Sequence, residues 1–134
     1  MVELRRTYRF CASHRLHRPE WSEAENLRVF GPAAHPSGHG HNFRLTIVVR
    51  GALDPVTERV ADLAALDRLV EEAVVEPFDH KNLNADLPSL AGRVPTAEVL
   101  ATEIWRRLAG RLPSGELAEV SLQQDEFLTA VHRG

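Results

Sequence analysis

The 134-residue sequence has little of several features that mark specialised classes of protein. It contains one cysteine, Cys11, so no internal disulfide can form, which is typical of a reducing compartment. No apolar run approaches the roughly 20 residues that are needed to cross a bilayer. Charges occur throughout the first twenty residues, where a secretory signal would need an apolar segment. We therefore expect a cytoplasmic protein that does not work in a membrane.

A surplus of one charge sign is also missing. The formal net charge is -3 with both signs interspersed, so the chain offers no basic patch for nucleic acid, although a local arginine cluster could hold a small phosphate. Apolar residues make up 43% and charged residues 26%, the balance of an ordinary globular protein. This length fits one domain, and we expect residues 1–134 to form a single unit.

Two segments alternate with a period of two and predict half-buried strands. In residues 2–14 the even positions are mostly apolar, and His14 continues the phase of Phe10 and Ala12. In residues 39–49 the apolar phase begins with His39 and His41. Between these strands, residues 15–38 are rich in proline and glycine and predict a long loop, which in a compact domain is usually functional.

The second half of the chain predicts two helices followed by two strands. Asp62 is a candidate N-cap for a helix that Pro77 ends, and Val60–Ala61 just before it could close a short strand. Thr96 is a candidate N-cap for a second helix, which ends near Gly110. Residues 118–124 and 127–132 predict the last two strands. The fold class is then α+β with the order ββααββ, in which two helices cover one face of a four-stranded antiparallel sheet.

Three histidines stand out in this pattern. His39 and His41 must face the same way because strand side chains alternate, and both lie in the apolar phase, as His14 does on the other strand. Three neutral imidazoles with one open position are typical of a catalytic zinc ion. On spacing alone, histidines without a metal explain the pattern equally well.

The remaining histidines give weaker signals. His80 follows Asp79 in the loop after the first helix, and an aspartate can orient a histidine for general acid–base catalysis. An adjacent Asp-His pair is nevertheless common. His17 and His35 lie in the long loop, where exposure to solvent is the default, and His132 near the terminus is expected to be structural.

Four motifs, in order and spacing, resemble the 6-pyruvoyl-tetrahydropterin synthase family and its 6-carboxytetrahydropterin synthase relatives. They are FCASHRLH at 10–17, GHGHNF at 38–43, FDHKNLN at 78–84 and PTAE at 95–98. The resemblance covers essentially the whole chain. It implies the tunnelling fold, in which subunits join edge to edge and two trimers stack as a hexamer with active sites at the subunit interfaces. Open edge strands would suit such an assembly.

The same resemblance implies roles for particular residues. Zn²⁺ would bind His14, His39 and His41, and in the family it binds the side-chain hydroxyls of dihydroneopterin triphosphate and promotes loss of triphosphate and internal redox tautomerisation. Asp79 and His80 match the family's proton-transfer pair. The acidic residues that hold the pterin would fall at Glu98 and near Gln124, and Thr96 belongs to the same substrate-binding motif.

Two positions depart from the family pattern. The family's catalytic cysteine falls at Ala33, or in the carboxy-type relatives at His35, which makes His35 a candidate substitute base. Cys11 lies in the opposite strand phase to His14, so we expect it to point away from the metal and to be a poor replacement for the missing cysteine. Gln124 stands where the family has a pterin-anchoring glutamate, unless Glu126, in the same phase, is the anchor. Unmatched polar groups would weaken pterin binding.

Three functions remain as hypotheses. The first is a zinc-dependent lyase that acts on dihydroneopterin triphosphate or a related polyhydroxylated substrate. The second is a divergent relative that cleaves or cyclises the side chain of another substrate in specialised metabolism. The third is a catalytically silent subunit that binds zinc and a metabolite.

Overall fold

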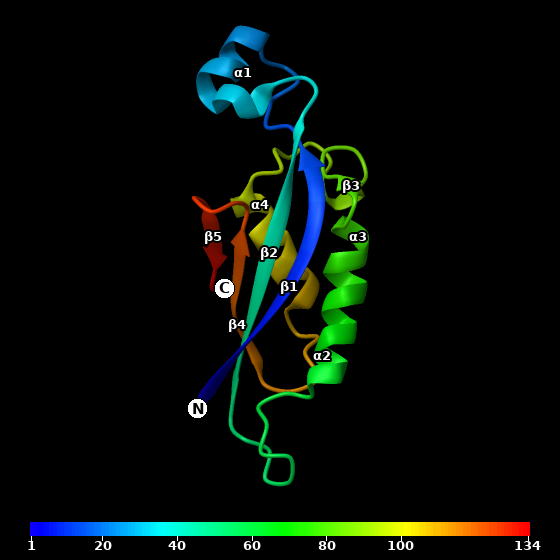
Figure 1. Ribbon diagram of the computed structural model, residues 1–134, viewed down its shortest axis with the longest axis vertical. Coiled ribbons are helices and arrows are strands. Elements are labelled where there is room, and N and C mark those ends of the chain that lie inside the picture. Colours follow the sequence, from blue (N-terminus) through cyan, green and yellow to red (C-terminus); the bar gives the residue numbers. More distant parts are fainter.

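The computed structural model describes residues 1–134 and has an α+β architecture built on one five-stranded sheet (Figure 1). The strands follow the order β3-β1-β2-β4-β5, and all neighbours are antiparallel except β3, which runs parallel to β1. They are β1 (Val2–His14), β2 (His39–Gly51), β3 (Lys81–Asn82), β4 (Glu116–Gln123) and β5 (Thr129–His132). The predicted fold class is confirmed. The two-residue β3, too short to leave a sequence pattern, makes the sheet mixed rather than fully antiparallel.

The β1–β2 ladder is long and regular. It pairs every residue from Val2 with Gly51 to His14 with His39, and it places Ala12 opposite His41. One face of both strands is buried, because Phe10, Phe43 and their neighbours in that phase pack into the core. The three histidines therefore lie at the same end of two adjacent strands and on the same, helix-covered face.

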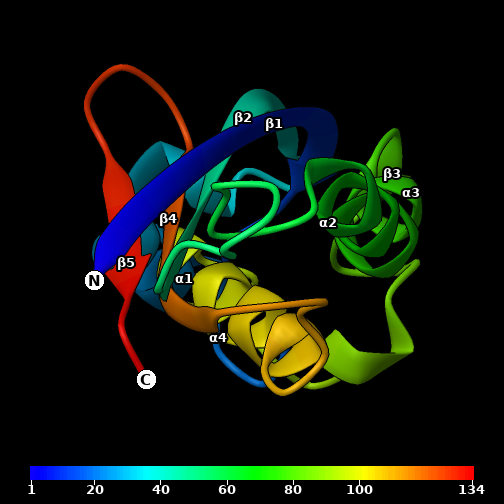
Figure 2. The ribbon, with the colours of Figure 1, turned by 90° about the horizontal axis from the view of Figure 1, so that it is seen from below.

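The helices pack on one side of the curved sheet (Figure 2). Two helical units lie side by side on this face: a continuous segment of α2 (Leu63–Val70), the π-helical turn η2 (Glu71–Val75) and α3 (Glu76–Phe78), and, beside it, α4 (Ala97–Leu108). Both predicted N-caps are confirmed, since the side chain of Asp62 accepts the N–H of Ala65 and that of Thr96 accepts the N–H of Val99. No helix has the length and apolarity required to cross a membrane.

The first helix does not end at Pro77 as expected but continues to Phe78. Proline has no N–H for the carbonyl four residues earlier, which here belongs to Ala73. That carbonyl instead accepts a hydrogen bond of 3.0 Å from Nη1 of Arg107 on α4. The π-helical turn before Pro77 and this donor from another helix together allow the proline to be accommodated.

The segment expected to be a loop, residues 15–38, contains α1 (Glu23–Phe30) and the 3₁₀ helix η1 (Gly31–Ala34), which project beyond the end of the sheet (Figure 1). Ser22 caps α1 by accepting the N–H of Glu25 at 3.1 Å, and Gly31, with φ of 61°, ends it.

Three further features of the structure differ from the expected elements. Val60 and Ala61 are buried but form a bend rather than a strand, and the last strand begins at Thr129 instead of 127. A 3₁₀ turn, η3 (Pro88–Leu90), precedes α4.

Candidate metal centre

The three histidines converge where β1 ends and β2 begins. His14, His39 and His41 each offer a ring nitrogen, and these nitrogens all lie within 4.8 Å of one another. The ring centroids are 4.6 Å apart for His14 and His39, and 4.8 Å apart for His39 and His41. Such a cluster of imidazoles forms a group that could hold a metal ion.

His14 is oriented by its surroundings. Only 2% of the residue is exposed, and its Nδ1 lies 2.8 Å from the carbonyl oxygen of Pro95, just before α4. Because a carbonyl can only accept, Nδ1 carries the proton and Nε2 keeps its lone pair. Burial lowers the pKa of His14 to about 4, so the ring is neutral at physiological pH. A neutral ring held in this tautomer is the form that ligates metals.

Two ring nitrogens in the cluster have no protein partner. Nε2 of His14 and Nε2 of His41 are both buried and make no hydrogen bond. Buried polar atoms are nearly always paired, and leaving one unpaired costs about 1–3 kcal/mol. Burial also lowers the pKa of His41, which keeps this ring neutral. Two neutral nitrogens facing a third histidine fit a divalent metal ion bound by three imidazoles.

A glycine permits this close approach of the strands. Gly38, immediately before His39, has φ of 68°, in the left-handed region that favours glycine. A Cβ at this position would lie 3.1 Å from the backbone oxygen of His14. Any larger residue would therefore push apart the ends of β1 and β2 that carry the cluster.

Asp79 and His80 form a second group, at the edge of β1. Oδ2 of Asp79 lies 2.9 Å from Nδ1 of His80, and its Oδ1 accepts the backbone N–H of Cys11 at 2.9 Å. The hydrogen bond from Cys11 lowers the pKa of Asp79, which therefore stays ionised. His80 itself has φ of 59°, an uncommon conformation for a residue with a side chain, and such strain often marks functional sites.

The structure keeps His35 apart from both groups. Its side chain is exposed, and its Nδ1 accepts the N–H of Ser37 at 3.2 Å. It lines a cavity with Arg15 and Glu23, whereas a different cavity is lined by both His41 and His80.

The predicted substrate-binding residues occupy two places. Thr96 caps α4, and Glu98 is exposed in the first turn of that helix. Gln124 is half-buried just beyond β4, and its backbone N–H bonds the carbonyl of Leu128. Glu126 is exposed in the turn that follows.

Cys11 is the site residue that the sequence pattern set aside. Its phase opposite to His14 is confirmed by the alternation of burial along β1. Yet its Sγ lies within 4.8 Å of the ligand atoms of both Asp79 and His80. No signal along β1 predicts this, because the contact depends on where the chain returns after α3.

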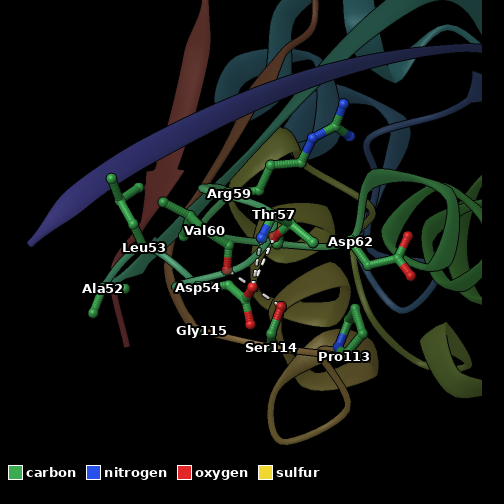
Figure 3. A pocket seen from close by; sticks show the side chains of 12 residues that line it. Ala52, Leu53, Asp54, Thr57, Arg59, Val60, Asp62, Pro113, Ser114 and Gly115 are labelled. Carbon is green, nitrogen blue, oxygen red and sulfur yellow. Dashed lines mark hydrogen bonds between the residues drawn. The ribbon is translucent and has the colours of Figure 1, made fainter.

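A further pocket lies at the other end of the sheet, where β2 ends (Figure 3). Its walls come from residues 51–62 and 113–115. Asp54 accepts the backbone N–H groups of Val56 and Thr57, and Ser114 donates to the carbonyl of Val60. These bonds close a turn and fasten it to the loop before β4. The residues that line this pocket include no histidine.

Known proteins are similar to this chain over nearly its full length. A family model described as 6-pyruvoyl tetrahydropterin synthase matches residues 3–134. The chain belongs to the 6-pyruvoyl tetrahydropterin synthase family. The human 6-pyruvoyl tetrahydrobiopterin synthase is 41% identical over 133 residues, which cover 99% of this chain and 92% of that protein. The corresponding protein of Dictyostelium discoideum is 35% identical over 99% of this chain and 96% of its own length.

Solved structures agree with the family fold. The 6-pyruvoyl tetrahydropterin synthase of Caenorhabditis elegans superposes with a TM-score of 0.93 at 30% identity, covering 99% of this chain and 95% of that one. The Plasmodium vivax structure of the same name, at 14% identity and a TM-score of 0.67, covers 99% and 97% and shows the common fold alone.

Proposed function

We propose that this chain is a zinc-dependent lyase acting on dihydroneopterin triphosphate or a closely related polyhydroxylated substrate. The observation that carries the proposal is the histidine cluster with two buried, unpartnered Nε2 atoms. Membership of a family whose human relative is named 6-pyruvoyl tetrahydrobiopterin synthase, and whose Caenorhabditis elegans relative is named 6-pyruvoyl tetrahydropterin synthase, supports the reaction class.

The residues of the chain fit distinct tasks in this reaction. A zinc ion on His14, His39 and His41 would act as a Lewis acid toward substrate hydroxyls. His14 is held in the ligating tautomer by the carbonyl of Pro95. Asp79 accepts the Nδ1 proton of His80, which leaves Nε2 of that ring free to move a substrate proton.

We also propose that the active site forms between subunits of a hexamer. The strand β5 ends the sheet on one side with an unpaired edge, and Phe127 beside it is 88% exposed. Open edges and exposed aromatic side chains both favour association with further copies. Light scattering on the purified protein should give a hexamer, whereas a monomer at micromolar concentration would contradict this part of the proposal.

A second candidate function rests on Ala33 and Gln124. The first offers a methyl group where the family resemblance places a thiol, and the second offers an amide where it places a carboxylate. A site with these changes suits a relative that cleaves the side chain of its substrate by a retro-aldol step, in which the metal and one base suffice. This candidate predicts a shortened product from the same polyhydroxylated substrate.

The test is incubation of zinc-loaded protein with dihydroneopterin triphosphate, followed by mass spectrometry of the products. Loss of triphosphate with formation of a pyruvoyl product supports the lyase, and a shortened side chain supports the second candidate. The variant His41→Ala should abolish turnover and zinc binding. The control His132→Gln, which alters a histidine lying against the ring of Trp105 away from the cluster, should retain both. Binding of the substrate without any product would contradict both candidates and indicate a silent binding subunit.

A further inference from the structure

The only cysteine of the chain lies beside an Asp-His pair outside the metal cluster. The Sγ of Cys11, a carboxylate oxygen of Asp79 and a ring nitrogen of His80 all lie within 4.8 Å of one another. Cys11 is a free cysteine at the surface, and it lines a cavity together with His80 and His41. A thiol, an imidazole and a carboxylate in one group can act together, because the imidazole can accept the thiol proton while the carboxylate orients the ring.

The backbone holds the three residues together from both sides. The carbonyl of Cys11 accepts the N–H of His80 at 2.6 Å, and the N–H of Cys11 donates to Oδ1 of Asp79 at 2.9 Å. Two residues further along β1, the carbonyl of Ser13 accepts the N–H of Leu83 at 2.8 Å. These bonds fix the turn after α3 to the edge of β1 beside Cys11. They therefore hold His80 in its left-handed backbone conformation.

The pairing within the group favours proton transfer over metal binding. Both oxygens of Asp79 are already engaged, one by the N–H of Cys11 and the other by Nδ1 of His80. A metal ion bound by all three side chains would have to compete with these bonds. With Nδ1 bonded to the carboxylate, the free Nε2 is the atom through which the ring can exchange a proton.

We propose that Cys11 is the proton-transfer thiol of this enzyme, with His80 as its proton partner and Asp79 as the residue that positions the ring. This inference rests on the proposed lyase function, in which Ala33 cannot exchange a proton. The thiol gives its proton to Nε2 of His80, and the thiolate removes a proton from a substrate carbon beside a hydroxyl or carbonyl group. The imidazolium returns its proton to another substrate atom, so no proton or electron is gained or lost. The cavity shared by Cys11, His80 and His41 provides space for the substrate.

The test combines alkylation of the thiol with turnover. Iodoacetamide should modify wild-type Cys11 at pH 7 at least about fivefold faster than it modifies Cys11 in His80→Asn, because the thiolate is the reacting form and His80 takes its proton. Asparagine is chosen because it tolerates a positive φ better than most residues. The control His132→Gln, at a histidine that lies against Trp105 and outside this cavity, should be alkylated at the wild-type rate. Equal rates in wild type and His80→Asn would overturn the proposal.

The turnover measurement uses Cys11→Ser and Cys11→Ala with zinc content measured in parallel. Loss of the thiol should lower kcat by roughly 10²-fold or more, while zinc content and KM stay within about twofold. Wild-type kcat in both variants would overturn the proposal. If the wild-type protein shows no turnover with dihydroneopterin triphosphate, the proposed function fails, and the alkylation rates alone then decide whether Cys11 and His80 form a proton-transfer pair.

Discussion

Acidification should lower the free energy of unfolding of the metal-free protein, because His14 is buried in its neutral form. The pKa of His14 is lowered by burial to about 4 in the folded protein, whereas it is about 6.5 in an unfolded chain. A group with a depressed pKa stabilises the fold fully above its unfolded pKa and loses that contribution as the pH falls toward the folded value. The loss should therefore occur between pH 6.5 and pH 4.

The expected size follows from linkage. Between pH 7 and pH 5 the two pKa values predict a decrease of about 2 kcal/mol in the free energy of unfolding from this histidine. His14 is almost completely buried, so screening by solvent should reduce this figure little. Other histidines whose pKa is lowered by burial, including His41, also contribute to the pH dependence of the free energy of unfolding. Comparison with a variant that lacks only the His14 ring isolates the contribution of His14.

Urea denaturation of EDTA-treated protein at pH 7 and pH 5 measures the effect. The variant His14→Gln should be about 2 kcal/mol less sensitive to the pH change than wild type, because no ionisable ring remains at the buried position. The control His35→Gln, at an exposed histidine, should keep the wild-type difference. The same pH dependence in wild type and His14→Gln would refute the assignment of a buried, neutral ring.

Further predictions concern other parts of the molecule. The double variant Ala33→Cys with Gln124→Glu should raise conversion of dihydroneopterin triphosphate in the mass-spectrometric assay if the pocket otherwise fits a pterin, by roughly tenfold or more. The variant Gly38→Ala should lose about 1–2 kcal/mol of stability in urea and bind zinc more weakly, because the left-handed φ disfavours alanine and the new Cβ would press on the backbone of His14. Burial opposes ionisation of Glu103, but its hydrogen bonds with two arginines lower its pKa to about 2, so Glu103→Gln should reduce the free energy of unfolding at pH 7 by about 1.5–3 kcal/mol.

Features that repeat along the chain were predictable from the sequence. The alternation in β1 and β2 is long enough to give the facing of His14, His39 and His41, and the ladder between the strands then brings them together. The N-caps at Asp62 and Thr96 were equally visible, because capping depends only on residues within one turn. The helix α1 could have been predicted as well, since Ser22 followed by Glu25 is a capping pattern, but the density of proline and glycine around it favoured a loop.

Features that depend on distant residues were not predictable in this way. The helix continues through Pro77 because Arg107, on another helix, satisfies the carbonyl of Ala73. Strand phase correctly placed Cys11 away from the histidine cluster, but it could not reveal that Asp79 and His80 return to the edge of β1. Both contacts join segments more than thirty residues apart, and no local pattern encodes them.

The zinc content of the purified, zinc-reconstituted protein tests the central claim most directly. Mass-spectrometric metal analysis after removal of loosely bound ions should give about one zinc per chain for the wild type, and near zero for His39→Ala with the fold retained by circular dichroism. The control His132→Gln should bind zinc as the wild type does. A wild-type stoichiometry near zero, or full zinc retention in His39→Ala, would contradict the assignment of His14, His39 and His41 as the metal centre.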